Sequence, residues 1–167
     1  MKKLLSLMLL LMAAVMTTAT FTSCSDDDDD NSYTGKDELS FSVMGKDIKQ
    51  SNTADVNYIV NQNSNGSVSV IIPEETFDFS AVKMGNIVQG GYSVNNIPYD
   101  ATKKAYYLDY SNKASADVFV YGNKKNYTVT VGKITVTFSG NKVTVVNVHK
   151  FGDMPMTMTG TFVGTRK

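Results

Sequence analysis

Short stretches in which apolar and polar residues alternate constrain this fold most. The segment 127–148 shows the pattern best, because a two-residue turn at Gly132-Lys133 would pair Val129 with Val136 and Thr130 with Thr135. Such matched polarity fixes the register of a hairpin, and a glycine at the first turn position suits a type II′ turn. We therefore predict a hairpin here. The alternative is one long strand bent at Gly132, which would flip the apolar face at the bend.

The same alternation recurs along the chain and predicts roughly eight to ten short strands. Asn65-Gly66 and Gly140-Asn141 indicate tight turns, and Pro73 should end a strand because proline cannot donate to a sheet ladder. No helical pattern competes with these strands. The expected fold is all-β, an antiparallel meander that closes as a β-barrel, with a β-sandwich as the alternative.

Charge argues against a nucleic-acid partner. Five of the 16 acidic residues lie at 26–30 and two of the 16 basic residues are Lys2 and Lys3. The remaining 11 acidic and 14 basic residues give the rest of the chain only a slightly basic balance, without a basic stripe.

The N-terminus has the organisation of a secretory signal. Lys2 and Lys3 precede an apolar run from Leu4 to Met16, and small or hydroxyl residues follow. The run is shorter than the roughly 20 residues of a membrane-spanning helix, so an uncleaved anchor is the less favoured alternative. We assign residues 1–23 to a signal peptide.

The chain's only cysteine, Cys24, ends this signal. A lone cysteine in an exported protein has no disulfide partner. The residues Phe21–Ser23 before it resemble the lipobox of bacterial lipoproteins. That resemblance implies cleavage before Cys24 and acylation of its sulfur and new amine, which would anchor the protein to a membrane. An unlipidated secreted protein is the alternative.

A serine and an acidic run follow the cysteine: Ser25, Asp26, Asp27, Asp28, Asp29 and Asp30. A run of like charges stays extended and hydrated, so residues 24–32 should form a lipidated tether. The motif also resembles the export signal of Bacteroidota lipoproteins. This implies an outer-membrane lipoprotein on the cell surface, with a periplasm-facing lipoprotein as the alternative.

Residues 33–167 form the predicted domain, and they resemble the calycin-like, or lipocalin-like, lipoprotein domains of Bacteroidota. The resemblance is carried by Tyr33–Lys36, by Met84–Ile87 leading to Asn95–Ile97, and by Met154–Met158 before Thr161–Gly164. It implies a calycin-like β-barrel, a family whose members often hold apolar ligands.

Methionine and tyrosine supply the candidate ligand-binding residues. Thioethers adapt to irregular apolar ligands, and tyrosines suit binding faces because they combine an apolar body with a polar tip. Ordinary core packing is the alternative for these residues. The candidates are Tyr92, Tyr106, Tyr110, Met154, Met156 and Met158.

We predict no catalytic residues, metal site or cofactor. His149, the only histidine, is expected at an edge strand or in a loop and has no recognisable catalytic partner. Glu74, Glu75 and Asp78 lack calcium-loop spacing and are expected in a solvated loop.

The resulting functional hypothesis is a membrane-anchored, non-catalytic binding module for a small apolar or aromatic ligand. The alternative is a structural or interaction lipoprotein that docks to another surface protein or a glycan.

Replacing the lipidated sulfur tests the anchor. We expect Cys24→Ala to abolish palmitate labelling and to move the protein from the membrane fraction to the soluble fraction, because no thioether can form. Ser23→Ala keeps a small residue before the cysteine and should still label. Undiminished labelling of Cys24→Ala would refute lipidation at this residue.

Overall fold

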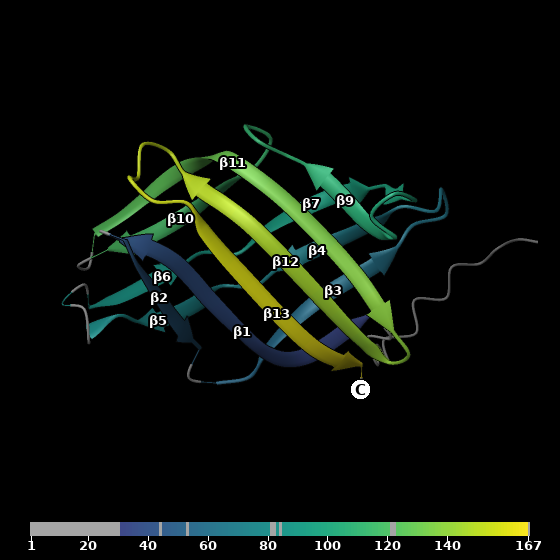
Figure 1. The fold of residues 1–167 in the computed structure, drawn as a ribbon, viewed down its shortest axis with the longest axis horizontal. Coiled ribbons are helices and arrows are strands. Elements are labelled where there is room, and N and C mark those ends of the chain that lie inside the picture. Colours follow the sequence, from purple (N-terminus) through teal and green to yellow (C-terminus); the bar gives the residue numbers. More distant parts are fainter. Residues whose placement is uncertain are drawn as a thin grey trace, which may run out of the picture.

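Every element of this computed structural model is a β-strand, which confirms the all-β prediction (Figure 1). The structure describes residues 31–43, 45–52, 54–80, 83, 85–120 and 123–166. In these ranges we find no helix with the length and apolarity needed to cross a bilayer. The predicted signal peptide, Cys24, Ser25 and the aspartates Asp26–Asp30 lie outside the described residues.

The strands are β1 (Ser32–Val43), β2 (Lys46–Ser51), β3 (Val56–Gln62), β4 (Val68–Ile72), β5 (Glu75–Asp78), β6 (Asn86–Gln89), β7 (Tyr92–Ile97), β8 (Tyr99–Asp100), β9 (Ala105–Asp109), β10 (Ser115–Val120), β11 (Asn123–Ser139), β12 (Lys142–Phe151) and β13 (Met158–Arg166).

These strands pair into one antiparallel sheet that curls strongly into an open half-barrel (Figure 1). The pairing order is β5-β6-β10-β11-β12-β13-β1-β3-β4-β7, with β2 added beside β1 and the β8–β9 pair beside β11. The first strand joins the last, since Tyr33 lies opposite Arg166. The described strands therefore form one continuous sheet rather than the two separate sheets of the sandwich alternative.

Alternate residues of each strand fill the inside of the curl, as the period of a strand requires. In β12, for example, Val143 and Val145 are buried while Thr144 and Val146 are partly exposed. Curling the sheet brings the inner faces of distant strands together. Tyr58 of β3 therefore stacks on Phe162 of β13, with their ring centroids 4.0 Å apart.

Two predicted turns are confirmed. Asn65-Gly66 lies between β3 and β4, with Gly66 at φ 77°, and Gly140-Asn141 joins β11 to β12, with Gly140 at φ 61°. Positive φ is easily adopted only by glycine, which accounts for the residue type at both positions.

The predicted hairpin at Gly132-Lys133 is wrong, and the alternative of one long strand is right. β11 runs unbroken through Gly132 and pairs with β12 along its length. Val129 does not face Val136; instead Val136 lies opposite Val145 of β12 and Tyr106 of β9.

A β-bulge resolves the conflict in polarity that had favoured the hairpin. The register shifts between Val129 and Val131, so the residues on each side keep their own apolar inner face. The Thr130 hydroxyl donates to the backbone oxygens of Lys150 and Gly152, at 3.3 and 2.9 Å, and fixes the bulge.

Gly132 is required for close packing rather than for a turn. A Cβ atom at this position would lie 2.7 Å from the Tyr110 ring, which is closer than real Cβ contacts. The glycine therefore lets the Tyr110 ring lie directly on β11.

The two ends of the pairing order belong to one bent hairpin. β5 follows β4 after Pro73 and Glu74, and β7 follows β6 after Gly90 and Gly91. β4 pairs with β7, and β5 with β6. Proline interrupts the first arm because it cannot donate to the ladder, and Gly91 permits the bend, since a Cβ there would lie 2.9 Å from the Ile72 carbonyl oxygen.

Candidate functional site

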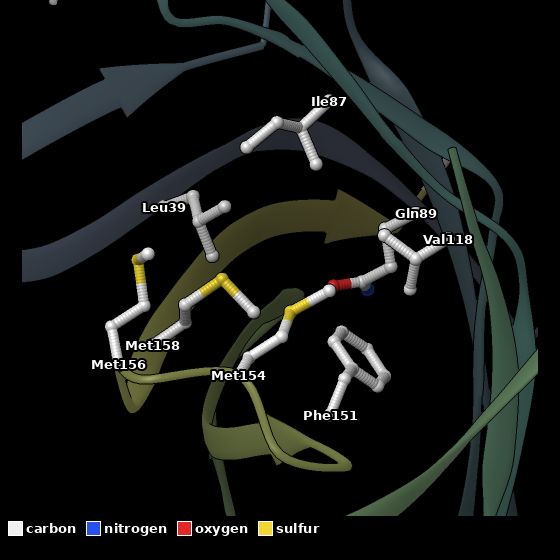
Figure 2. A pocket seen from close by; sticks show the side chains of 8 residues that line it. All are labelled: Leu39, Ile87, Gln89, Val118, Phe151, Met154, Met156 and Met158. Atoms are coloured by element: carbon white, nitrogen blue, oxygen red, sulfur yellow. The ribbon is translucent and has the colours of Figure 1, made fainter. Parts of the chain in front are cut away.

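An apolar cavity of about 170 Å³ lies at the end of the curled sheet where β5, β6 and β10 approach the connection between β12 and β13 (Figure 1). Figure 2 shows the lining side chains around a common space between the strands. The lining residues are Leu39, Ile87, Gln89, Val118, Phe151, Met154, Met156 and Met158.

Three methionines make one wall of this cavity, but they do not lie on a single strand as expected. Only Met158 belongs to β13; Met154 and Met156 lie in the connection that leaves β12 after Phe151 and contains Pro155. The connection folds so that all three side chains still line the same space (Figure 2). Met154 and Met156 are partly exposed, so they form the rim.

Gln89 is the one polar residue among the eight that line the cavity. Its side chain is only 4% exposed, and its Oε1 atom has no hydrogen-bond donor among the described residues. In Figure 2 the amide lies among the apolar lining groups. A buried acceptor without a donor is costly, so Gln89 marks the cavity as a place suited to a hydrogen-bond donor.

Two buried carboxyl groups lie deeper in the sheet than the cavity. Asp37 precedes the lining residue Leu39 by two positions on β1, so both side chains are on the inner face. Glu75 of β5 is the cross-strand partner of the lining residue Gln89. The carboxyl groups therefore belong to the layer next to the cavity lining.

The carboxyl pair carries one proton at neutral pH. Burial raises the pKa of Glu75 to about 9, helped by the charge of Asp37 and a hydrogen bond with it. Burial also raises the pKa of Asp37, although hydrogen bonds, first that from Tyr58, oppose the change. The Tyr58 hydroxyl donates to Asp37 Oδ2 at 2.7 Å. Glu75 therefore holds the proton, and the negative charge resides on Asp37.

His149 contributes another acceptor to this layer. Burial lowers its pKa to about 4, so the ring is neutral at neutral pH. Its Nδ1 lies 3.1 Å from the Asn147 carbonyl oxygen, to which a ring N–H donates. Nε2 is then an acceptor, and it has no partner among the described residues.

Tyr92 and Tyr110, two of the predicted ligand-binding residues, form a polar cluster with Asn147 inside the sheet instead of lining the methionine cavity. Tyr110 Oη donates to Asn147 Oδ1 at 2.6 Å, and Asn147 Nδ2 donates to Tyr92 Oη at 2.6 Å. Burial raises the pKa of Tyr110 to about 12 and that of Tyr92 further, so both hydroxyls stay neutral.

Tyr106 lies away from the cavity. It is partly buried on β9, with its ring edge-on to Phe138 at 5.9 Å and to the exposed Tyr99 at 5.4 Å. The structure therefore brings Met154, Met156 and Met158 together and places all three tyrosine candidates elsewhere.

Two expectations about polar residues are wrong. His149 is not at an edge or in a loop, because β12 pairs with both β11 and β13 and the side chain is 1% exposed. Glu75 is not in a solvated loop but is 2% exposed on β5, whereas Glu74 and Asp78 are exposed. The reason is phase: Glu75 alternates in step with Phe77 and therefore shares its inner face.

The same signal could have located Asp37 and Gln89, which sequence reasoning missed. Asp37 is in phase with Leu39 and Phe41, and Gln89 is in phase with Ile87. A polar residue at an apolar position of an alternating strand thus identifies each member of the buried polar layer.

The parts of the chain that the structure describes contain no group of three histidine, cysteine, aspartate or glutamate side chains that could hold a metal ion. A scan against models of known protein families finds no match, and searches for similar curated proteins and similar solved structures find none either. The inference of function therefore depends on the site itself.

The buried carboxyl group should make stability depend on pH. Unfolded Glu75 loses its proton near the ordinary pKa of 4.5, but the folded protein holds it to about 9. Folding takes up a proton between these values, so the free energy of unfolding falls with rising pH, by up to about 1.4 kcal/mol per pH unit. His149, whose pKa falls from 6.5 to about 4, opposes this trend only below pH 6.5. We expect stability to fall from pH 6.5 to 9.

Urea unfolding at several pH values measures this slope. Glu75→Gln should flatten it, because the variant has no proton to lose at this position. Glu74→Gln, at the exposed neighbouring position, is the matched control and should retain the wild-type slope. Equal slopes in Glu75→Gln and the wild type would contradict a buried protonated Glu75.

Proposed function

We propose that this protein is a membrane-anchored, non-catalytic binding module that takes a small apolar or aromatic group into the methionine-walled cavity. The observation that carries the proposal is the lining: seven apolar side chains and one amide. Such a lining offers no nucleophile or general base to a bound molecule. It does offer the apolar contacts and the single polar contact typical of a ligand site.

The size of the cavity favours a small group. Its volume of about 170 Å³ is close to the roughly 150 Å³ of an engineered apolar cavity that binds benzene. One aromatic ring or a short alkyl chain would fill it. A larger ligand would bind with only such a part inside.

The methionine rim suits entry and adaptation. Met154 and Met156 are partly exposed and lie in a connection rather than in a strand. Unbranched thioether side chains change rotamer easily and fit irregular apolar shapes. A ligand can then enter between them while the sheet stays paired.

We further propose that the curled sheet acts as a calycin-like barrel. The bent hairpin supports this, since β4 and β5 are nearly continuous and so are β6 and β7. Pairing of β4 with β7 and of β5 with β6 would then close one circuit of strands. The cavity would be one mouth of that barrel.

The proposed anchor is the lipid on Cys24. The chain enters β1 at Ser32, directly after the acidic residues. A hydrated tether of this kind would hold the cavity away from the membrane. We propose an outer-membrane location with the domain on the cell surface; a periplasm-facing domain would leave the binding role unchanged.

Toluene tests the proposed cavity directly. In full-length protein with carbon-13 labelled methionine methyl groups, toluene should produce saturable NMR shifts at Met154, Met156 and Met158. Met156→Glu should abolish them, because a charge at the rim opposes desolvation of the apolar cavity.

Thr157→Glu is the matched control, since it puts the same charge at the next, exposed position of the connection, and it should bind toluene as the wild type does. An absence of saturable shifts in the wild type, or full binding by Met156→Glu, would overturn the proposed function.

A further inference from the structure

We propose that the natural ligand carries a hydrogen-bond donor head, in its best form a primary ammonium group, which binds the acceptor layer at the inner end of the methionine-walled cavity. This inference rests on the proposed function, because it names the chemical class of the ligand for the same cavity.

The first contact would be Gln89. It lines the cavity, it is more than nine-tenths buried, and its Oε1 has no donor among the residues the structure describes. A donor on the ligand would satisfy this oxygen at the moment when the apolar part fills the space between the methionines. The amide thus orients a ligand that the seven apolar side chains cannot orient.

The next layer inward has the same character on three strands. Asp37 of β1, Glu75 of β5 and His149 of β12 are buried, and each has a side-chain acceptor atom without a donor in the described part of the chain. Asp37 and His149 each lie two residues from a lining residue, Leu39 and Phe151 respectively, on the same strand face.

The strand between them leaves room for a head group. On β13, Gly160 lies beside both β1 and β12, and a Cβ there would be at ordinary contact distance, 3.5 Å, from Asp37 Oδ2. No side chain from this position separates the Asp37 carboxyl group from the centre of the layer.

Charge selects among possible heads. The layer holds the negative charge of Asp37 and no basic side chain, since His149 is neutral. A carboxylate head would meet acceptors and a like charge, whereas an ammonium group brings three donors and the opposite charge. A hydroxyl head would satisfy one acceptor without neutralising the charge.

Four probes of similar size test this ranking with the full-length protein: benzylamine, benzyl alcohol, toluene and benzoate. We expect benzylamine to bind at least about tenfold more tightly than toluene, benzyl alcohol to fall between them, and benzoate to bind most weakly. NMR or calorimetric titration at neutral pH measures the four dissociation constants.

Two variants locate the cause. Gln89→Leu removes the first acceptor and Asp37→Asn removes the charge, so each should bring benzylamine close to toluene. Toluene binding in the same variants shows that the cavity is intact. Glu38→Gln is the matched control, because it removes a carboxylate from the next residue of β1, where Glu38 pairs with exposed Lys49.

The outcomes separate the two proposals. If toluene binds the wild type and benzylamine binds no more tightly, or if both variants keep the benzylamine advantage, the donor-head inference is wrong and the apolar binding function stands. If none of the probes binds the wild type, both proposals fail. Should a variant lose toluene binding as well, the wild-type ranking and the other variant still decide.

Discussion

Burial of the Asp37 and Glu75 carboxyl groups inside one sheet is the constraint on which the rest of this structure depends. Two charged carboxylates next to each other in an apolar interior would be strongly unfavourable, so Glu75 retains a proton and Asp37 is stabilised by the Tyr58 hydroxyl. Gly160 leaves the space beside Asp37 free of a side chain. The interior is thus divided into an apolar cavity lined by methionines at one end and a layer of acceptors next to it.

The curled sheet places these two parts in contact. The long strands β1, β11, β12 and β13 form one wall, and the bent hairpin of β4–β7 brings Glu75 and Gln89 across from it. The bulge at Thr130 keeps both halves of β11 facing inward, and Gly132 admits the Tyr110 ring. Tyr110, Tyr92 and Asn147 satisfy one another by hydrogen bonds, so that cluster supports the interior, whereas the acceptors near the cavity remain available to a ligand.

Alternation in the sequence predicted the strand class, the turns at Gly66 and Gly140 and the gathering of Met154, Met156 and Met158. It could not distinguish a turn at Gly132 from a bulge, because both give the same local polarity and only the packing of Tyr110 and the pairing with β12 decide between them. The buried polar residues were missed because polar side chains were assumed to be exposed. Their phase with Phe77, Leu39 and Ile87 was nevertheless present in the sequence. The mutual contact of Asp37 and Glu75 depends on strand pairing between distant segments, which no local pattern encodes.

A crystal structure of the full-length protein with benzylamine would test the central claim, that the cavity and the acceptor layer form one site. The account predicts the ring between Met154, Met156 and Met158, with the nitrogen within hydrogen-bonding distance of Gln89 Oε1 and directed toward Asp37. A ring bound elsewhere, or a nitrogen directed out past the methionine rim into solvent, would contradict it.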